Sequence, residues 1–237
     1  MRRENENFMK PADDYREKEY SYFNVNRHDL FQLIPTGTPR RVLEIGAADG
    51  SMLVALKQSG KAREVVGVEL ISISGGGQNR EEIDRFIIAD VEQKCLDLEP
   101  ESFDVLICGD VLEHLRDPWS TLDYLAGFLR DGGSLVVSLP NILYWRAFGR
   151  IALGDFQYAP SGVLDRTHLR FFCKKNMLDL VRSARFRILS VEPSFRRHLD
   201  LKKDRLMNAL TLGLAERFFA QQYLIVAEKS RAASDGN

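Results

Sequence analysis

The stretch Arg41-Val-Leu-Glu-Ile-Gly46-Ala-Ala-Asp-Gly50-Ser51 carries the strongest fold signal in this chain. Its first half is a short apolar run that stops at Gly46, and its second half is a turn of small residues. A helical pattern begins directly after the turn, with Met52 and Leu53. Small residues in such a turn let backbone N–H groups come close to a ligand at the positive end of a helix. The stretch therefore predicts a strand, a turn and a helix that form a ligand-binding corner.

Outward from this corner, apolar runs alternate with helical patterns. We predict further strands at residues 64–69, 86–89, 103–108, 134–139, 186–191 and 223–227. We predict helices at residues 26–34, 119–129, 174–184 and 201–219, a glycine loop at 75–77 with a short helical stretch behind it, and a turn at 131–133. Short, nearly continuous apolar strands between helices are typical of a parallel sheet that is buried on both faces. The expected fold class is α/β, a doubly wound, mostly parallel sheet of seven strands.

The domain organisation that we expect is one domain over residues 1–237 with an inserted cap. Residues 1–36 form an N-terminal helical segment with an aromatic cluster at Tyr15, Tyr20, Tyr22 and Phe23, and residues 37–140 form the ligand-binding core. Residues 141–173 are rich in aromatic residues and Arg and fit neither the helix nor the strand period, so we predict a loop-rich cap there. Residues 174–230 hold the C-terminal helices and the last two strands.

Composition limits the classes of partner. Hydrophobic residues make up 44% and charged residues 28% of the chain, and Lys plus Arg total 33 against 34 Asp plus Glu. Such a balance creates no global field for nucleic acid or an acidic membrane. No apolar run reaches the roughly 20 residues of a membrane helix, and the charged N-terminus lacks the apolar core of a secretory signal. We expect a cytoplasmic protein that acts on a small molecule, with no nucleic-acid partner and no membrane insertion.

The three cysteines, Cys95, Cys108 and Cys173, are far apart and show no paired spacing. They fit a reducing compartment and predict neither a disulfide framework nor a zinc site. The sequence therefore predicts no metal site.

Acidic residues follow the predicted strands one after another. Glu44 lies in the first strand, Glu69 ends the second, 25 residues later, and Asp90 and Asp110 follow the third and fourth. A carboxylate at the end of the second strand can accept hydrogen bonds from a ribose diol, and ligands of such sheets lie at the carboxyl ends of the strands. Each acid, taken alone, can also be a helix cap or a solvated strand end. Their succession along one edge favours a binding site.

Together these residues resemble the class I S-adenosylmethionine-dependent methyltransferases over about residues 40–140. The resemblance implies a Rossmann-like fold and S-adenosylmethionine as cofactor. It also implies a set of cofactor contacts: the turn with Gly46, Ala48 and Gly50 against the methionine part, Glu44 beside it, Glu69 and Leu70 at the ribose, and Asp90 and Val91 at the adenine. Asp110-Val-Leu-Glu-His-Leu115 looks like the family's fourth motif, and residues 131–141 look like its fifth strand after a turn.

The sequence differs from the family pattern at two places, and one other class of enzyme must be weighed against it. Ala48 replaces the central glycine of the family's turn, and residues 71–78 are poor helix material where the family usually starts a helix. The rival is a nicotinamide or flavin enzyme, whose fingerprint is Gly-x-Gly-x-x-Gly. Asp49 lies where a pyrophosphate would bind, and a fixed carboxylate there repels phosphate but tolerates an ammonium group. The methyl donor is therefore favoured.

Methyl transfer to a hydroxyl needs alignment of the two reactants, exclusion of water and removal of a proton. His114 follows the fourth strand, and the unperturbed pKa of histidine suits a general base near neutral pH. We expect His114 to be the catalytic base. In the alternative, Glu113 and His114 cap or brace the following segment.

The cap supplies the candidate substrate-binding residues. Asp165, Arg166 and His168 lie in a charged stretch that ends with two phenylalanines at 171 and 172, and we expect them to face the acceptor. The alternative is a salt-bridged loop anchored by the phenylalanines. Tyr144 and Trp145 are candidates for an aromatic wall, with cap core as the alternative.

Residues 138–141, 144–146 and 165–172 together look like a bacterial subgroup linked to cell-surface polysaccharide assembly, which implies O-methylation of a sugar hydroxyl. The segment from Pro140 to Arg146 is also similar to a methyltransferase-like accessory family of methionine biosynthesis, whose members act with a partner enzyme. Leu206, Leu210 and Leu214 form an apolar stripe in the last predicted helix. We expect this stripe to pack on the sheet, with a homodimer contact as the alternative.

Overall fold

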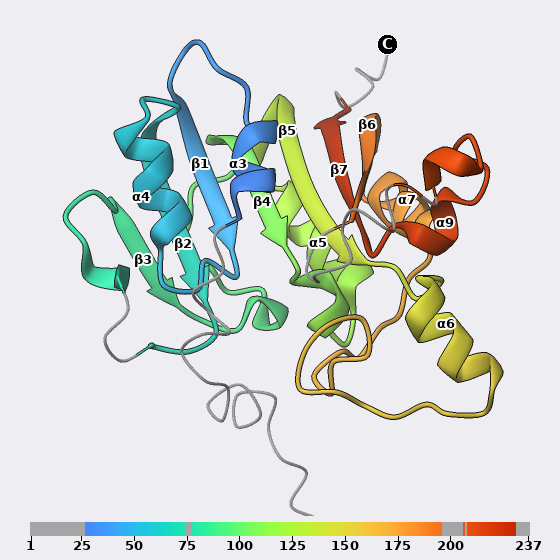
Figure 1. Ribbon diagram of the computed structural model, residues 1–237. Helices are drawn as coiled ribbons and strands as arrows, with labels where there is room; N and C mark the ends of the chain where they lie inside the picture. Colours follow the sequence, from blue (N-terminus) through green and yellow to red (C-terminus); the bar gives the residue numbers. More distant parts are fainter. Residues whose placement is uncertain (1–26, 74–76, 196–205, 207, 231–237) are drawn as a thin grey trace, which may run out of the picture.

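The computed structural model describes residues 27–73, 77–195, 206 and 208–230, and within them seven strands form one sheet in the order β3-β2-β1-β4-β5-β7-β6 (Figure 1). The strands are β1 (Arg40–Ile45), β2 (Ala62–Glu69), β3 (Arg85–Ile88), β4 (Phe103–Gly109), β5 (Leu129–Pro140), β6 (Phe186–Ser194) and β7 (Gln222–Lys229). The α-helices are α3 (His28–Leu33), α4 (Ser51–Gln58), α5 (Pro118–Ala126), α6 (Trp145–Ala152), α7 (Lys174–Ser183) and α9 (Glu216–Phe219). Three short 3-10 helices are η1 (Gly77–Asn79), η2 (Val91–Gln93) and η3 (Leu112–His114).

The direction of the strands sets where a ligand can bind. Strands β1 to β5 pair in parallel, whereas β7 runs antiparallel to both β5 and β6. The chain winds outward from β1 to β3 and then returns to β4 on the other side of β1. Parallel α/β sheets bind ligands at the carboxyl ends of the strands beside such a reversal. The predicted doubly wound, mostly parallel sheet is confirmed.

Both faces of the sheet are covered, because alternate residues of each strand point to opposite sides. Val42 in β1 packs in a cluster with Leu30 of α3 and Leu53 of α4. Its neighbour Leu43 packs in a second cluster with Leu122 of α5 and residues of α7. Full burial of each such side chain contributes about 1.5–3 kcal/mol. The continuous apolar runs in the sequence therefore reflect strands that are buried on both faces of the sheet.

The turn predicted at residues 131–133 is instead an irregularity inside β5. Phe103 pairs with Leu129 and Val105 with Ser134, so a short piece of β4 lies opposite a longer piece of β5. Gly132 adopts φ +70°, a left-handed conformation that glycine allows at little cost. The glycine pair thus kinks the strand without ending it, and β5 spans Leu129–Pro140.

The helix predicted over residues 201–219 is interrupted in its described part, where residues 206, 208–210 and 216–219 are helical. Residues 211–215 form a turn, with φ +52° at Leu212 and φ +79° at Gly213, and α9 follows as a separate helix. A left-handed glycine is a common helix stop. Leu206, Leu210 and Leu214 are all exposed, so the stripe does not pack on the sheet. None of the described helices is long and apolar enough to cross a membrane.

Two further sequence predictions lie at the edge of the described residues. The first described helix is α3, at His28–Leu33, within the range predicted for it. The aromatic cluster at residues 15–23 and two residues of the glycine loop, 75 and 76, lie outside the described residues.

The cap at residues 141–173 contains one helix that the sequence did not reveal, α6. A small apolar cluster of its own holds the cap together, built from Tyr144, Ala147, Val163 and Leu164. Two bridges fix the rest of the cap: Asn141 pairs with Phe172, and residues 159 and 165 pair with each other. Figure 1 shows the cap beside the edge of the sheet to which β1 and β5 point.

Candidate active site

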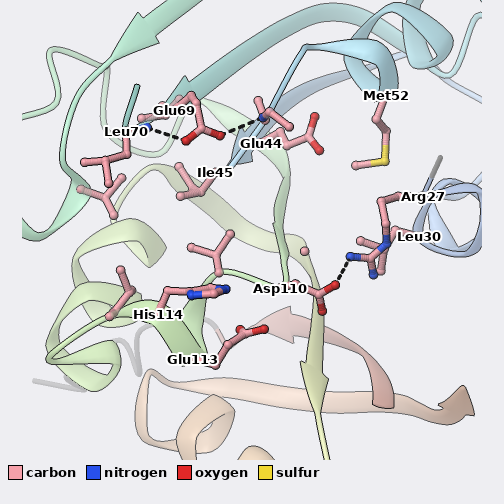
Figure 2. Close-up of a pocket in the computed structure, with 18 of the residues that line it drawn as sticks. Arg27, Leu30, Glu44, Ile45, Met52, Glu69, Leu70, Asp110, Glu113 and His114 are labelled. Atoms are coloured by element: carbon pink, nitrogen blue, oxygen red, sulfur yellow. Dashed lines mark hydrogen bonds and ion pairs between the residues drawn. The ribbon is translucent and has the colours of Figure 1, made fainter. Parts of the chain in front are cut away.

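A cavity of 1280 Å³ lies at the carboxyl ends of β1 to β4. It is lined by the turn after β1, the ends of β2 and β3, the segment after β4, and Gly162, Val163, Asp165 and His168 of the cap. Ligand pockets commonly measure about 300–1,000 Å³. The cavity therefore has room for a large ligand and a second molecule beside it. Figure 2 shows Glu44 and Glu69 on one side of this space and Glu113 and His114 on the other.

The small-residue turn after β1 adopts left-handed conformations at three positions, with φ +69° at Gly46, +50° at Ala48 and +79° at Gly50. A left-handed Ala costs about 1–2 kcal/mol, and a hydrogen bond from the Ala48 N–H to Glu69 Oε2, 2.9 Å long, helps to hold it. A Cβ at Gly46 would lie 2.5 Å from Val111 Cγ2. Gly46 and Ala48 line the cavity, whereas Gly50 lies outside the lining and precedes α4.

Glu69 ends β2 with a buried carboxylate that faces the cavity. Its Oε2 accepts from Ala48, and its Oε1 accepts from the Leu70 N–H at 2.7 Å. Burial raises the pKa of Glu69, and the backbone N–H groups oppose that rise. Each carboxylate oxygen can accept a second hydrogen bond. Two fixed oxygens at this edge suit a pair of neighbouring hydroxyls, and Leu70 lines the cavity beside them.

Glu44 is the second buried carboxylate on this side, only 6% exposed. Its Oε2 has no hydrogen-bond partner among the described residues. Burial raises the pKa of Glu44 to about 8, although the positive charge of Arg27 lowers it in part. Burying an unpartnered carboxylate oxygen is costly, so this position fits a cationic group such as an ammonium.

Asp90 combines two roles that the sequence could not separate. Its Oδ1 accepts from the Glu92 N–H at 2.9 Å and caps η2, and its Oδ2 accepts from the Gln93 side chain at 3.2 Å. Asp90 and Val91 also line the cavity. The hydrogen bond that caps η2 thus fixes the Asp90 carboxylate at the far end of the site.

Asp110 is held by a network at the other end. Its Oδ2 accepts from Arg27 Nη1 at 2.6 Å, and its Oδ1 accepts from Ser138 Oγ at 2.9 Å and from the Gln222 amide. Its backbone is left-handed, with φ +57°. Arg27 also donates to Ser138 Oγ at 2.8 Å. This network ties the segment before α3 to β4, β5 and β7 and closes one wall of the cavity.

Glu113, His114 and His168 meet across the cavity from Glu44. The rings of His114 and His168 lie 4.7 Å apart, edge to face, and Glu113 Oε1 is 4.0 Å from His168 Nε2. Glu113 is 1% exposed, and neither of its carboxylate oxygens has a hydrogen-bond partner among the described residues. Burial, and then Asp110, raise the pKa of Glu113 well above its usual value.

The role of His114 as catalytic base is predicted from the unperturbed pKa of histidine, and its surroundings in the structure change that premise. Burial and the neighbouring His168 lower the pKa of His114 to about 4, so its imidazole is neutral at neutral pH. Its Nδ1 lies 3.0 Å from the Thr167 carbonyl oxygen. A base whose conjugate acid has so low a pKa accepts a proton weakly. A neutral imidazole can instead accept a hydrogen bond or ligate an ion.

The cap is fastened directly to this cluster. The backbone N–H groups of Leu169 and Arg170 both donate to the Glu113 carbonyl oxygen at 2.9 Å. Asp165 is 1% exposed, and its Oδ1 accepts from the N–H and the hydroxyl of Thr167 at 2.9 and 2.8 Å. Asp165 and His168 line the cavity. The sequence allowed two interpretations of residues 165–172, a loop that anchors the cap and a segment that faces the acceptor. The structure shows that the stretch anchors the cap and also lines the cavity.

Three residues predicted to bind the substrate lie outside the cavity lining. The Tyr144 side chain is buried in the cap's own apolar cluster, and Trp145 is 41% exposed on α6. Arg166 donates its N–H to the Ala159 carbonyl oxygen and is not among the residues that line the cavity.

Sequence reasoning missed Arg27 and underrated Glu113. Arg27 reaches Asp110 from a position 83 residues earlier, and no local pattern marks such a pair. Glu113 carried a signal, a carboxylate beside a histidine after a strand, but the pattern fits a bracing role equally well. Burial decides between the two, and burial of a polar residue is not readable from the sequence.

Comparisons with known proteins agree with this architecture. A family model described as "Methyltransferase domain" matches residues 15–191. A ubiquinone biosynthesis O-methyltransferase from Xylella fastidiosa (strain M23) is 32% identical over 105 residues, which are 43% of this chain and 42% of that protein. The chain thus matches less than half the length of this relative.

Two other proteins match over more of their length. A ubiquinone biosynthesis O-methyltransferase from Coxiella burnetii (strain Dugway 5J108-111) is 24% identical over 187 residues, 72% of this chain and 75% of that protein. The crystal structure of a SAM-dependent methyltransferase from Archaeoglobus fulgidus has a TM-score of 0.63 at 19% identity and covers 88% of this chain and 97% of that one. At such low identity the structural likeness supports the fold alone. Because the family model spans most of the chain, the chain belongs to the methyltransferase-domain family, within the class I S-adenosylmethionine-dependent methyltransferases.

Proposed function

We propose that this chain transfers the methyl group of S-adenosylmethionine to a hydroxyl oxygen of a small molecule. One observation carries the proposal: a single cavity brings together buried carboxylates at the ends of neighbouring strands and, opposite them, a cluster of Glu113, His114 and His168. The relatives in Xylella and Coxiella are named as O-methyltransferases, which supports oxygen as the acceptor atom.

On the cofactor side, defined as the turn 46–50 with Glu44, Glu69 and Asp90, we assign the contacts from the chemistry of each group. The buried, unpartnered Oε2 of Glu44 suits the ammonium of the methionine part. The two oxygens of Glu69 suit the ribose hydroxyls, with Leu70 beside them. Asp90 and Val91 suit the adenine edge, because they lie past the end of β3 on the same rim.

The acceptor side, defined as Glu113, His114, Asp165 and His168, places four ionisable side chains in the lining of the cavity. These side chains can form hydrogen bonds with an acceptor rich in hydroxyls, such as a sugar. The names of the relatives support an oxygen acceptor. Asp110 closes the wall between the two sides through its bonds to Arg27 and Ser138.

A non-catalytic accessory protein is not favoured. A protein that only recruits a partner needs neither a cavity of 1280 Å³ nor a polar cluster across it from the cofactor side. The comparisons name methyltransferases, and no observation on the described residues requires a partner enzyme.

The test combines binding with turnover. Calorimetry of the full chain with S-adenosylhomocysteine, the demethylated cofactor, should give about one site per chain. Incubation with methyl-labelled S-adenosylmethionine and a panel of catechols, phenols and sugar nucleotides should then move label to an oxygen of one class. Absence of cofactor binding in folded protein would refute the proposal. Label on nitrogen or carbon would refute the proposal that the acceptor atom is oxygen.

A further inference from the structure

We propose that Glu113, His114 and His168 bind a divalent metal ion on the acceptor side of the cavity. The three residues come from two segments far apart in the sequence, η3 and the cap. One ligand atom from each lies within 4.8 Å of the others. Atoms that share an ion through bonds of about 2.0–2.2 Å lie roughly 3–4 Å apart. Modest side-chain rotation therefore brings the cluster to bonding distance.

The histidine rings are oriented as metal-binding rings are. His114 Nδ1 lies 3.0 Å from the Thr167 carbonyl oxygen, and His168 Nδ1 lies 3.1 Å from the Val163 carbonyl oxygen. A carbonyl oxygen only accepts, so Nδ1 is the protonated nitrogen in both rings and donates. The basic nitrogen of each ring is then Nε2. Backbone carbonyls that fix histidine ligands in this way are a regular feature of metal sites.

Glu113 supplies the independent observation. Its carboxylate is buried, 1% exposed, lines the cavity, and has no hydrogen-bond partner for either oxygen among the described residues. A buried carboxylate is stable only when it is paired, hydrogen-bonded or coordinated to a metal. Its Oε1 is already 4.0 Å from His168 Nε2. A cation between these two atoms gives the carboxylate the partner that the protein does not provide.

The donor set narrows the identity of the ion. Two imidazole nitrogens and one carboxylate favour first-row transition ions such as Zn²⁺ or Mn²⁺ over Ca²⁺ and Mg²⁺, which prefer oxygen donors. Three protein ligands leave at least one coordination position open, as in catalytic rather than structural zinc sites. The open position faces the cavity, because all three residues line it.

The role of the ion rests on the proposed function. The acceptor hydroxyl binds at the open position, where the ion lowers the pKa of the hydroxyl, as metal ions do for bound water. Its proton leaves to solvent water. The acceptor oxygen then forms a bond to the methyl carbon while the bond from that carbon to sulfur breaks, and the electron pair of that bond stays on sulfur. The positive charge of the sulfonium and the negative charge of the oxygen cancel in the products.

The experiment measures metal binding apart from methyl transfer. The tag-free full chain is stripped with a chelator and titrated with Mn²⁺, followed by the loss of the free-ion signal in electron paramagnetic resonance, and with Zn²⁺ by calorimetry. Mn²⁺ is included because the exposed thiol of Cys95 binds Zn²⁺ more readily than Mn²⁺. We expect one ion per chain. Failure of both ions to bind would overturn the proposal.

Variants locate the ion. His168→Ala and Glu113→Gln should each weaken metal binding by about 100-fold or more, since outer partners of such ligands alone contribute about 10–100-fold. His28→Ala removes a histidine outside the cluster and should leave the affinity unchanged. S-adenosylhomocysteine binding reports that each variant is folded. An equal effect of His28→Ala and His168→Ala would overturn the proposal.

A spectroscopic measurement on the unaltered chain serves as a second readout. X-ray absorption of the Zn²⁺ form should show scattering from imidazole rings, and a shell dominated by sulfur would refute the site. Metal binding without methyl transfer contradicts the proposed function and leaves the metal site intact. Methyl transfer and cofactor binding without metal binding contradict the metal site and leave the function intact.

Discussion

The cofactor side and the acceptor side of the cavity are built in different ways. Glu69 and Asp90 accept hydrogen bonds from backbone N–H groups close to them, so the end of each strand carries its own support. His114 and His168 meet only because the cap folds over η3, and Glu113 has no hydrogen-bond partner among the described residues. The difference indicates that affinity for the cofactor is a local property of the sheet edge. Chemistry on the acceptor depends instead on the packing of the cap.

The largest effect should come from the acceptor side. His114 is one of the three proposed ligands of the ion that lowers the pKa of the acceptor hydroxyl. His114→Ala should therefore lower kcat by about 10²–10⁴-fold, the range for assistance in proton removal, and should leave cofactor affinity unchanged. Steady-state kinetics with the acceptor that the labelling assay selects, together with calorimetry of S-adenosylhomocysteine, measure the two quantities. A parallel loss of cofactor affinity would show that the two sides are not independent.

Glu69→Ala should have the opposite effect, a loss of cofactor affinity. Loss of hydrogen bonds to a charged group should weaken S-adenosylhomocysteine binding by about 1–3 kcal/mol, roughly 5–150-fold, with metal affinity unchanged. Glu64→Ala is the matched control, because Glu64 lies on the same strand β2 but pairs with Arg41 away from the cavity. If both variants lower the affinity for S-adenosylhomocysteine equally, the ribose does not bind at Glu69.

The smallest effect concerns pH and sharpens the assignment of Glu44. The pKa of Glu44 is raised to about 8, so the carboxyl is protonated at pH 7 in the ligand-free protein. An ammonium favours the carboxylate, so binding at pH 7 should release a proton, and affinity should rise by up to about tenfold per pH unit below the pKa and level off near pH 8. Calorimetry in buffers of different ionisation enthalpy measures the release. Glu44→Gln should abolish it, and a release that persists in this variant would assign the proton to another group.

The sequence predicted the sheet edge well, because strand periodicity and turn glycines are local signals. The first four strands lie within a few residues of their predicted ranges, and Glu44, Glu69 and Asp90 all line one cavity. The roles of these residues in cofactor binding stay predictions until they are tested.

Predictions failed where distant parts of the chain decide the outcome. Gly213 in a left-handed conformation interrupts the last predicted helix, and Trp145 lies on α6, outside the cavity lining. The proposed metal site could not be predicted because spacing rules look for ligands within one motif, whereas His114 and His168 come together only through the fold of the cap. The low pKa of His114 arises from burial, which the sequence does not display.

The backbone of Glu113 has a consequence for redesign. Its carbonyl oxygen accepts hydrogen bonds from the N–H groups of Leu169 and Arg170, while its carboxylate faces the cavity. In the function that we propose, specificity and reactivity therefore share one residue and cannot be exchanged as separate modules. A chimaera that takes its cap from another methyltransferase must bring two amides that reach this carbonyl, or it will displace the reactive cluster together with the old acceptor preference.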